Sequence, residues 1–179
     1  MPNNPFDASF ALITSPEIEG GFSNDAYDPG GKTKYGIADH RDGKIDGMAD
    51  LNGDGKGDKK IEDLELSDTK AIYRKDYWEA CRCDNLPWPL SLYVFDAAVN
   101  QGVNAAKVML QQALNVKQDG ILGAATIGRA KACNLLEVPS MYMGIRAQRY
   151  MGTRNFDRFG KGWLKRIIMI ARAGERIDV

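Results

Sequence analysis

Apolar side chains recur at helical spacing through most of the chain that follows residue 68. The clearest run is residues 105–114, where the apolar positions fall at i, i+3, i+4, i+7 and i+8: Ala106, Met109, Leu110, Ala113 and Leu114. The same spacing predicts helices over 68–80, 91–101, 140–151 and 160–174, a short helix from Thr126, and a first helix over 7–18. Asn104 is the expected N-cap of the 105–114 helix.

Strand patterns are scarce, and the first third of the chain contains two irregular stretches. Residues 19–37 are rich in glycine and include Pro29, which excludes a continuous helix and leaves room for a small β element around 22–37. Residues 39–63 are rich in glycine and aspartate. At 179 residues the chain fits one domain or two small lobes. We therefore expect a mainly α fold with a small β or irregular element near the N-terminus.

Several classes of protein are disfavoured by the sequence. No run of about 18 apolar residues is present, so no membrane-spanning helix is expected. The first residues, Met1-Pro-Asn-Asn-Pro-Phe-Asp, lack the basic and apolar parts of a signal peptide, so we expect synthesis in a cytoplasm. Three cysteines, an odd number, favour reduced structural thiols over a disulfide framework.

The formal net charge of zero results from cancellation between two unlike regions. Residues 1–69 hold 15 acidic and 7 basic side chains, a net of −8, and residues 70–179 hold 9 acidic and 17 basic ones, a net of +8. Many of the bases lie near the C-terminus: Arg146, Arg149, Arg154, Arg158, Lys161, Lys165, Arg166, Arg172 and Arg176. They either solvate helix faces or attract a polyanion. No zinc-finger or RNA-binding motif accompanies them, so no nucleic-acid partner is expected.

The basic residues flank an apolar set formed by Trp163, Leu164, Ile167, Ile168 and Ile170. Core packing of this set is the first interpretation, and a membrane-active face is the alternative. The bases could attract anionic outer-membrane lipid or an anionic cell wall.

The stretch 19–37 places three polar groups on irregular backbone, where functional sites are often built. Glu19 follows the first expected helix, Asp28 lies in Tyr-Asp-Pro-Gly-Gly, and Thr33 comes shortly after. Two carboxyl groups on either side of a cleft suit glycoside hydrolysis, and a nearby hydroxyl could orient water. The alternative is a simple turn at Asp28 with Glu19 as a solvated surface acid.

The segments Glu19-Gly-Gly-Phe and Asp28-Pro-Gly-Gly-Lys-Thr-Lys-Tyr-Gly-Ile37 resemble the signature of the glycoside hydrolase 108 family, the N-acetylmuramidases common among phage endolysins. The resemblance continues in Ile72-Tyr-Arg-Lys-Asp-Tyr-Trp78 and Val94-Phe-Asp-Ala-Ala-Val-Asn-Gln-Gly102. Later segments, Asp119-Gly-Ile-Leu-Gly123 and Gly162-Trp-Leu-Lys-Arg166, resemble the predicted peptidoglycan-binding region of that family.

The resemblance implies a lysozyme-like, two-lobed helical fold. Residues 1–90 would form the catalytic lobe, with 39–63 as an insert, and residues 91–179 a peptidoglycan-binding lobe. It also implies that Glu19 is the general acid that cleaves the β-1,4 bond between N-acetylmuramic acid and N-acetylglucosamine. Asp28 and Thr33 are the accompanying catalytic candidates.

Four further residues are candidates for substrate binding. Tyr35 could stack on a sugar face, although core packing of its ring is equally consistent with the sequence. Gly36 would allow close approach of the substrate to the backbone. Asn100 and Gln101 could bind acetamido groups, and helix C-capping ahead of Gly102 is the alternative. The three tryptophans, Trp78, Trp88 and Trp163, are expected in the core.

The aspartate-rich stretch contains the pattern of a calcium-binding loop. Oxygen donors occupy loop positions 1, 3, 5 and 9, glycine occupies position 6, and Lys56 would contribute its carbonyl at position 7. Position 12 is Ile61 rather than glutamate, and Glu62 lies beside it. A flexible acidic loop and a weak magnesium site are the alternatives. The expected ligands of a structural Ca²⁺ are Asp50, Asn52, Asp54, Lys56, Asp58 and Glu62.

The resemblance, together with these patterns, implies a monomeric peptidoglycan hydrolase, an endolysin that acts on a Gram-negative wall. It would be made in the host cytoplasm and reach the periplasmic wall after a holin-type partner permeabilises the membrane. One rival is a lytic transglycosylase, which uses one acid and the substrate's own 6-hydroxyl. The other is a calcium-dependent wall-binding module without catalysis.

Overall fold

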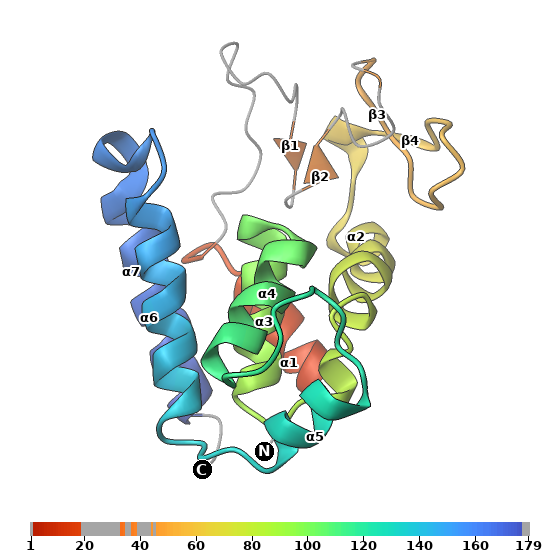
Figure 1. Ribbon diagram of the computed structural model, residues 1–179. Helices are drawn as coiled ribbons and strands as arrows, with labels where there is room; N and C mark the ends of the chain where they lie inside the picture. The colour runs from red at the N-terminus through yellow and green to blue at the C-terminus, as the bar shows by residue number, and fades with distance from the viewer. Residues whose placement is uncertain (1, 19–32, 35–36, 39–43, 45, 177–179) are drawn as a thin grey trace. The chain divides into compact units, whose positions relative to one another are not determined.

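The computed structural model describes residues 2–18, 33–34, 37–38, 44 and 46–176 (Figure 1). The chain divides into two compact units, one formed by Phe10–Asp76 and the other by Met1–Ser9 with Tyr77–Val179. This division falls earlier than the lobe boundary expected at residues 90 and 91. Packing explains the difference, because Trp78 contacts Phe95 edge-on at 5.3 Å and the Trp88 indole nitrogen donates to the Gly174 carbonyl oxygen at 2.8 Å.

The Phe10–Asp76 unit combines short helices with two small hairpins. Strands β1 (Thr33–Lys34) and β2 (Ile37–Ala38) pair antiparallel, as do β3 (Met48–Ala49) and β4 (Lys59–Lys60). The 3-10 turn η2 (Ile61–Asp63) leads into α2 (Leu66–Tyr73), and the π-helical turn η3 (Arg74–Glu79) follows it across the boundary between the units. The core of this unit contains Phe10, Ile13, Ile37, Ala49, Ile61, Leu64, Ile72 and Tyr73.

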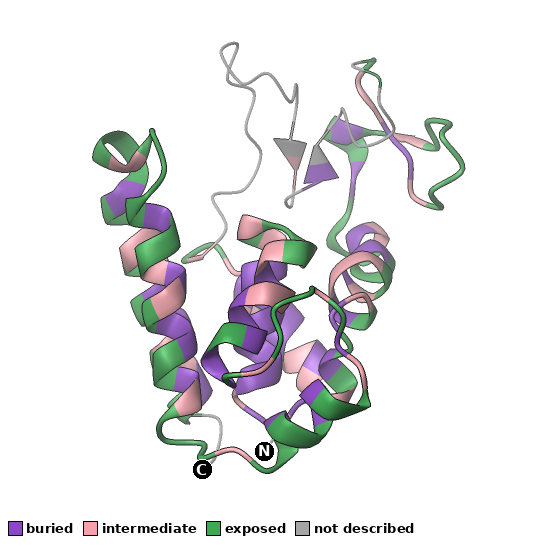
Figure 2. Cartoon of the chain, in the orientation of Figure 1, coloured by how far each residue is buried: buried purple, intermediate pink, exposed green. Residues whose placement is uncertain are grey.

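The other unit is built around α3 (Leu90–Gln101), whose residues 90–98 are all buried (Figure 2). A 3-10 turn, η4 (Cys83–Asn85), precedes α3 and packs against it. Helices α4 (Val103–Ala113), α6 (Val138–Met151) and α7 (Phe156–Arg176) also contact α3, and α5 (Ala124–Lys131) lies between α4 and α6 in the chain. An apolar helix surrounded on several sides is the expected centre of a core.

The mainly helical fold expected from the spacing of apolar residues is confirmed, and the small β element expected around 22–37 includes β1. Several helix boundaries differ from expectation: the helix expected over 68–80 is α2 followed by the π-helical turn η3, and α7 begins at Phe156 rather than at residue 160. Helix α1 (Pro5–Ile13) ends well before residue 18. Pro16 explains this, because proline has no N–H to donate and disfavours helical backbone at the residue before it.

The expected N-cap at Asn104 is wrong. Helix α4 begins at Val103, directly after Gly102, whose φ of +90° lets the chain turn from α3 into α4 without an intervening loop. Asn104 therefore lies inside the first turn of α4, and no side chain caps that helix. This position leaves the Asn104 amide available for other contacts.

The three cysteines are free thiols, as the sequence indicates. Burial raises the pKa of Cys81 to about 11 and raises that of Cys83 well above its ordinary value. Both thiols therefore stay protonated at neutral pH, which fits a structural role. None of the helices in the described ranges combines the length and the apolar character that crossing a bilayer requires.

Candidate active site and binding residues

The proposed catalytic residues are only partly within the described structure. Glu19, Asp28, Tyr35 and Gly36 lie outside the described residues. Thr33 is the first residue of β1, and its backbone pairs with Ala38. The second residue of β1 anchors the strand, because the Lys34 ammonium donates to the Glu62 carbonyl oxygen at 2.7 Å. The hairpin that follows the proposed catalytic stretch is thus tied to η2.

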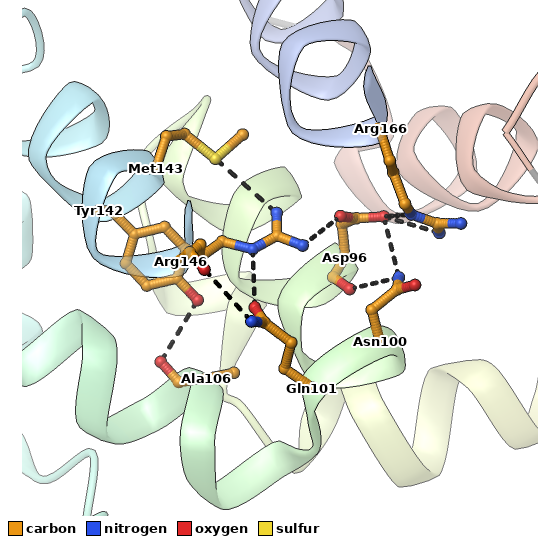
Figure 3. Close-up of polar contacts among 8 residues, drawn as sticks. All are labelled: Asp96, Asn100, Gln101, Ala106, Tyr142, Met143, Arg146 and Arg166. Atoms are coloured by element: carbon orange, nitrogen blue, oxygen red, sulfur yellow. Dashed lines mark hydrogen bonds and ion pairs between the residues drawn. The ribbon is translucent and has the colours of Figure 1, made fainter. Parts of the chain in front are cut away.

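Asn100 and Gln101 lie at the C-terminal end of α3, where both make side-chain contacts (Figure 3). The Asn100 amide donates to the Asp96 backbone carbonyl at 2.9 Å and lies 3.4 Å from one Asp96 carboxylate oxygen. Gln101 exchanges two hydrogen bonds with Arg146: its Oε1 accepts from Nε at 3.2 Å, and its Nε2 donates to the carbonyl at 3.4 Å. The two amides are therefore oriented by their neighbours.

Asp96 is the centre of these contacts and is fully buried. One of its carboxylate oxygens accepts from Arg146 Nη2 at 2.7 Å, and the other accepts from Arg166 Nε at 2.9 Å. These bonds join α3 to α6 and α7 (Figure 3). A buried carboxylate is tolerated only when it is paired and hydrogen-bonded, and Asp96 meets both conditions.

Arg146 is as deeply buried as its partner. Burial by itself would lower the pKa of Arg146, but the charge of Asp96, the neighbouring Tyr142 and Tyr150 and the hydrogen bond to Asp96 together raise the pKa. The guanidinium also donates to the thioether sulfur of Met143 at 3.7 Å. The Arg146–Asp96 ion pair therefore forms part of the core.

Two of the bases assigned to a polyanion-attracting surface do not lie on such a surface. Arg146 is fully buried and Arg166 is largely buried, and both bind Asp96. The sequence contained a signal for this pairing, since Asp96 is the only charged residue of α3 and lies among buried apolar residues. Such a residue needs a cationic partner elsewhere in the core.

The apolar set near the C-terminus divides into two groups. Ile167 and Ile170 are buried, which confirms core packing for these residues, whereas Ile168 is 58% exposed. Trp78 and Trp88 are buried as expected. Trp163 is only partly buried and stacks on Tyr150, with ring centroids 4.8 Å apart.

A cavity of about 330 Å³ lies beside Trp163 and the end of α3. Its walls include Asn100, Gln101, Arg149 and Tyr150. Asn100 and Gln101 therefore line this cavity. Their side-chain amides are at the same time hydrogen-bonded to Asp96 and Arg146. This position is compatible with ligand binding as well as with a structural role.

The loop between β3 and β4 folds around Asp50, which is only 4% exposed. Its two carboxylate oxygens accept from the backbone nitrogens of Gly53 at 2.6 Å and Gly55 at 2.9 Å. Gly55, at loop position 6, has a φ of +82°, which favours glycine. Asp58 accepts from the Leu51 nitrogen at 2.8 Å. The side chains expected as ligands thus also organise the loop.

The donor chemistry of this loop fits calcium, which binds carboxylate, amide and backbone oxygens. Position 12 contributes no side-chain ligand, because it is occupied by Ile61, whose apolar side chain is fully buried. Within the described ranges, no group of three or more His, Cys, Asp or Glu side chains is placed to hold a metal ion. The four acidic side chains expected as ligands, Asp50, Asp54, Asp58 and Glu62, therefore do not form such a group in the described structure.

Comparisons with known proteins place these residues in a wider context. Residues 15–102 match the sequence model of a family described as glycosyl hydrolase 108. No curated protein matches the chain. Among solved structures, Brucella abortus SagA resembles it with a TM-score of 0.78 and 29% identity, over 94% of this chain and 92% of that one. The matched family supports a glycoside hydrolase, and the likeness to SagA agrees with a lysozyme-like helical fold.

Proposed function

Because residues 15–102 match the glycosyl hydrolase 108 family, we propose that this protein hydrolyses peptidoglycan at the β-1,4 bond between N-acetylmuramic acid and N-acetylglucosamine. The observation that carries the proposal is the extent of that match. It includes Glu19, Asp28 and Thr33, the three catalytic candidates, and it also includes Asn100 and Gln101.

Glu19 is the proposed general acid. It would protonate the glycosidic oxygen as the bond to the leaving sugar breaks, which requires a carboxyl group that is protonated at the working pH. Asp28 would stabilise the developing positive charge or act on water, and the hydroxyl of Thr33 would orient that water.

Asn100 and Gln101 are proposed to bind the acetamido groups of the sugars. Support comes from their orientation, because amides already fixed by Asp96 and Arg146 lose little conformational freedom when a ligand binds. Tyr35 and Gly36 are proposed as further substrate-binding residues.

Incubation of the purified protein with purified peptidoglycan sacculi tests the proposal. Hydrolysis should lower the turbidity of the suspension and release soluble fragments. A wall-binding module without catalysis would bind the sacculi and leave the turbidity unchanged. A lytic transglycosylase would also clear the suspension, and the chemistry of the released ends separates it from a hydrolase.

We also propose that the biological setting is that of a phage endolysin acting on a Gram-negative wall. The support is the likeness of the catalytic motif to enzymes of that kind. In this setting the protein would act as a monomer and depend on a holin-type partner for access to the periplasm.

Calcium is proposed as a structural ion in the loop of residues 50–61. Support comes from the sequence pattern and from Asp50, whose carboxylate lies inside the loop. The ion would offset the repulsion among Asp50, Asp54 and Asp58, and Glu62 is the proposed substitute for the missing ligand at position 12. No catalytic step depends on it.

Removal of calcium with a chelator is expected to lower the melting temperature. An ion present at about 100 times its Kd stabilises the folded state by about 2.7 kcal/mol. For a protein of this size that energy corresponds to roughly 5–10 °C. Differential scanning calorimetry with and without EGTA measures the shift.

Two aspartate variants provide the control. Asp54→Asn removes a loop carboxylate and should abolish the response to EGTA. Asp46→Asn alters an exposed aspartate outside the loop and should preserve the response. An identical melting temperature with and without EGTA in the unaltered protein would contradict the calcium proposal.

A further inference from the structure

A groove runs between α4 and α6 in the Tyr77–Val179 unit. Its volume is about 640 Å³, within the range of small-molecule and peptide sites. Val108 and Met109 of α4 and Ile145 of α6 form apolar parts of its wall. The groove shares Gln101 and Arg149 with the smaller cavity beside Trp163, and none of the proposed catalytic residues is among the described residues that line it.

Four polar side chains line the groove and have unused hydrogen-bonding capacity. Asn104 and Gln112 come from α4, and Gln148 and Arg149 come from α6. Within the described part of the chain, none of the four makes a side-chain hydrogen bond or ion pair. The neighbouring amides Gln101 and Gln111, in contrast, are both engaged. The groove thus presents donors and acceptors toward solvent.

Arg149 gives the groove its charge. No aspartate or glutamate contributes to the groove wall, and no carboxylate of the described residues pairs with the Arg149 guanidinium. A guanidinium binds a carboxylate through two parallel hydrogen bonds, which gives both affinity and orientation. An occupant with at least one free carboxylate is therefore favoured.

Hydrogen bonds to the loop of residues 119–121 hold the α4 wall in place. Buried Gln111 donates to Asp119 Oδ1 at 2.8 Å and to the Ile121 carbonyl at 3.1 Å, and accepts from the Gly120 nitrogen at 2.8 Å. Gly120 has a φ of +73°, and a Cβ at this position would lie only 2.5 Å from the Asn104 side-chain oxygen. The positive φ therefore favours glycine where the loop meets Asn104.

The other end of the groove is also fixed. Gln101 forms part of the wall and is bound to Arg146, which in turn is paired with Asp96 in the core (Figure 3). The polar groups at this end therefore sit on a rigid support. A pre-ordered wall reduces the conformational entropy that a ligand must remove on binding.

We infer that this groove binds the peptide chains that branch from the peptidoglycan strand, an inference that rests on the proposed function. Each such peptide offers a free carboxylate to Arg149, backbone N–H and C=O groups to the amides, and alanine methyl groups to the apolar wall. No aromatic ring lines the groove among the described residues, so it lacks the flat apolar face on which a sugar ring stacks. These features favour the peptide over the glycan.

Titration with a soluble peptide tests the inference without requiring catalysis. The probe is the synthetic stem peptide N-acetyl-L-Ala-γ-D-Glu-meso-diaminopimelyl-D-Ala, and binding is followed by NMR on the ¹⁵N-labelled full chain. Backbone signals of residues 104–112 and 145–152 should shift. Arg149→Gln should weaken binding about tenfold, the effect expected when a charged hydrogen-bond partner is lost.

Two further variants sharpen the result. Arg154→Gln alters an exposed arginine outside the groove and should bind the peptide as the unaltered protein does. Val108→Trp should block the groove sterically and abolish binding, with the fold checked from the unaffected NMR signals. Equal affinity in the Arg149 and Arg154 variants, or shifts outside the groove, would overturn the inference. Groove signals that shift with peptide-free glycan strands and not with the peptide would overturn it as well.

The two proposals fail in different ways. Cleavage of peptide-free glycan strands by the unaltered protein tests the hydrolase activity alone, whereas the titration tests the groove alone. On intact sacculi, Arg149→Gln should raise the apparent KM relative to Arg154→Gln. A protein that binds the peptide but cleaves no strand would refute the proposed function and leave the groove assignment standing.

Discussion

Replacing Glu19 with glutamine is expected to lower the rate of peptidoglycan hydrolysis by about 10²–10⁴-fold, the contribution typical of a positioned general acid. Glutamine has nearly the same shape as glutamate but cannot deliver a proton at neutral pH. The leaving sugar would then depart as an alkoxide, which is a poor leaving group. Release of soluble fragments from purified sacculi, measured at several protein concentrations, gives the rate.

The matched control is Glu17→Gln, which removes an exposed carboxylate two positions earlier in the chain. Its hydrolysis rate should stay close to that of the unaltered protein. Binding to sacculi should be retained in both variants, because neither change affects the basic C-terminal region. Near-normal hydrolysis by the Glu19 variant would refute its assignment as the acid.

The second large effect concerns the folded state. Asp96→Asn is expected to destabilise the protein by about 3–5 kcal/mol, the usual result of breaking a buried ion pair. The variant would leave the Arg146 guanidinium buried without its countercharge and would weaken the contact from Arg166. For a chain of this length the melting temperature should fall by roughly 10 °C.

Thermal and urea unfolding measure this loss, and Glu175→Gln serves as its control. Glu175 is an exposed carboxylate of α7, so its neutralisation should change stability by no more than about 0.5 kcal/mol. Arg166→Met should give an intermediate loss, since Asp96 retains Arg146. If Asp96→Asn were as stable as Glu175→Gln, the ion pairs of Asp96 with Arg146 and Arg166 would not contribute substantially to the stability of the fold.

The helices could be predicted because the apolar residues that they bury recur at helical spacing in the sequence. The 105–114 pattern closely matches α4, since Ala106, Met109, Leu110 and Ala113 are the residues that the helix buries. The β3–β4 hairpin could not be predicted in this way, because strands of two residues are too short to show alternation. The only fully buried apolar residue in the two strands is Ala49, which is too little for a periodic pattern.

Charged residues were harder to place from the sequence. A count of bases does not distinguish Arg146, which is buried, from Arg149, which lines the groove. Arg146 is buried because it pairs with Asp96, and Asp96 is far from Arg146 in sequence. Likewise, Asn104 has the residue type of an N-cap, and the φ of Gly102 determines that it is not one.

The candidate catalytic residues were inferred from a motif rather than from geometry. Glu19 and Asp28 lie outside the described residues, so their assignment rests on the match of residues 15–102 to the family. For Asn100 and Gln101 the structure adds information that the sequence lacked, namely that Asp96 and Arg146 orient both amides.

Mass spectrometry of the fragments released from purified sacculi is the most direct test of the proposed reaction. Hydrolysis of the bond after N-acetylmuramic acid predicts fragments with a reducing N-acetylmuramic acid end, which borohydride converts to the sugar alcohol. Fragments that end in anhydro-muramic acid would show a lytic transglycosylase instead. Reducing N-acetylglucosamine ends, or no released fragments, would equally contradict the assignment.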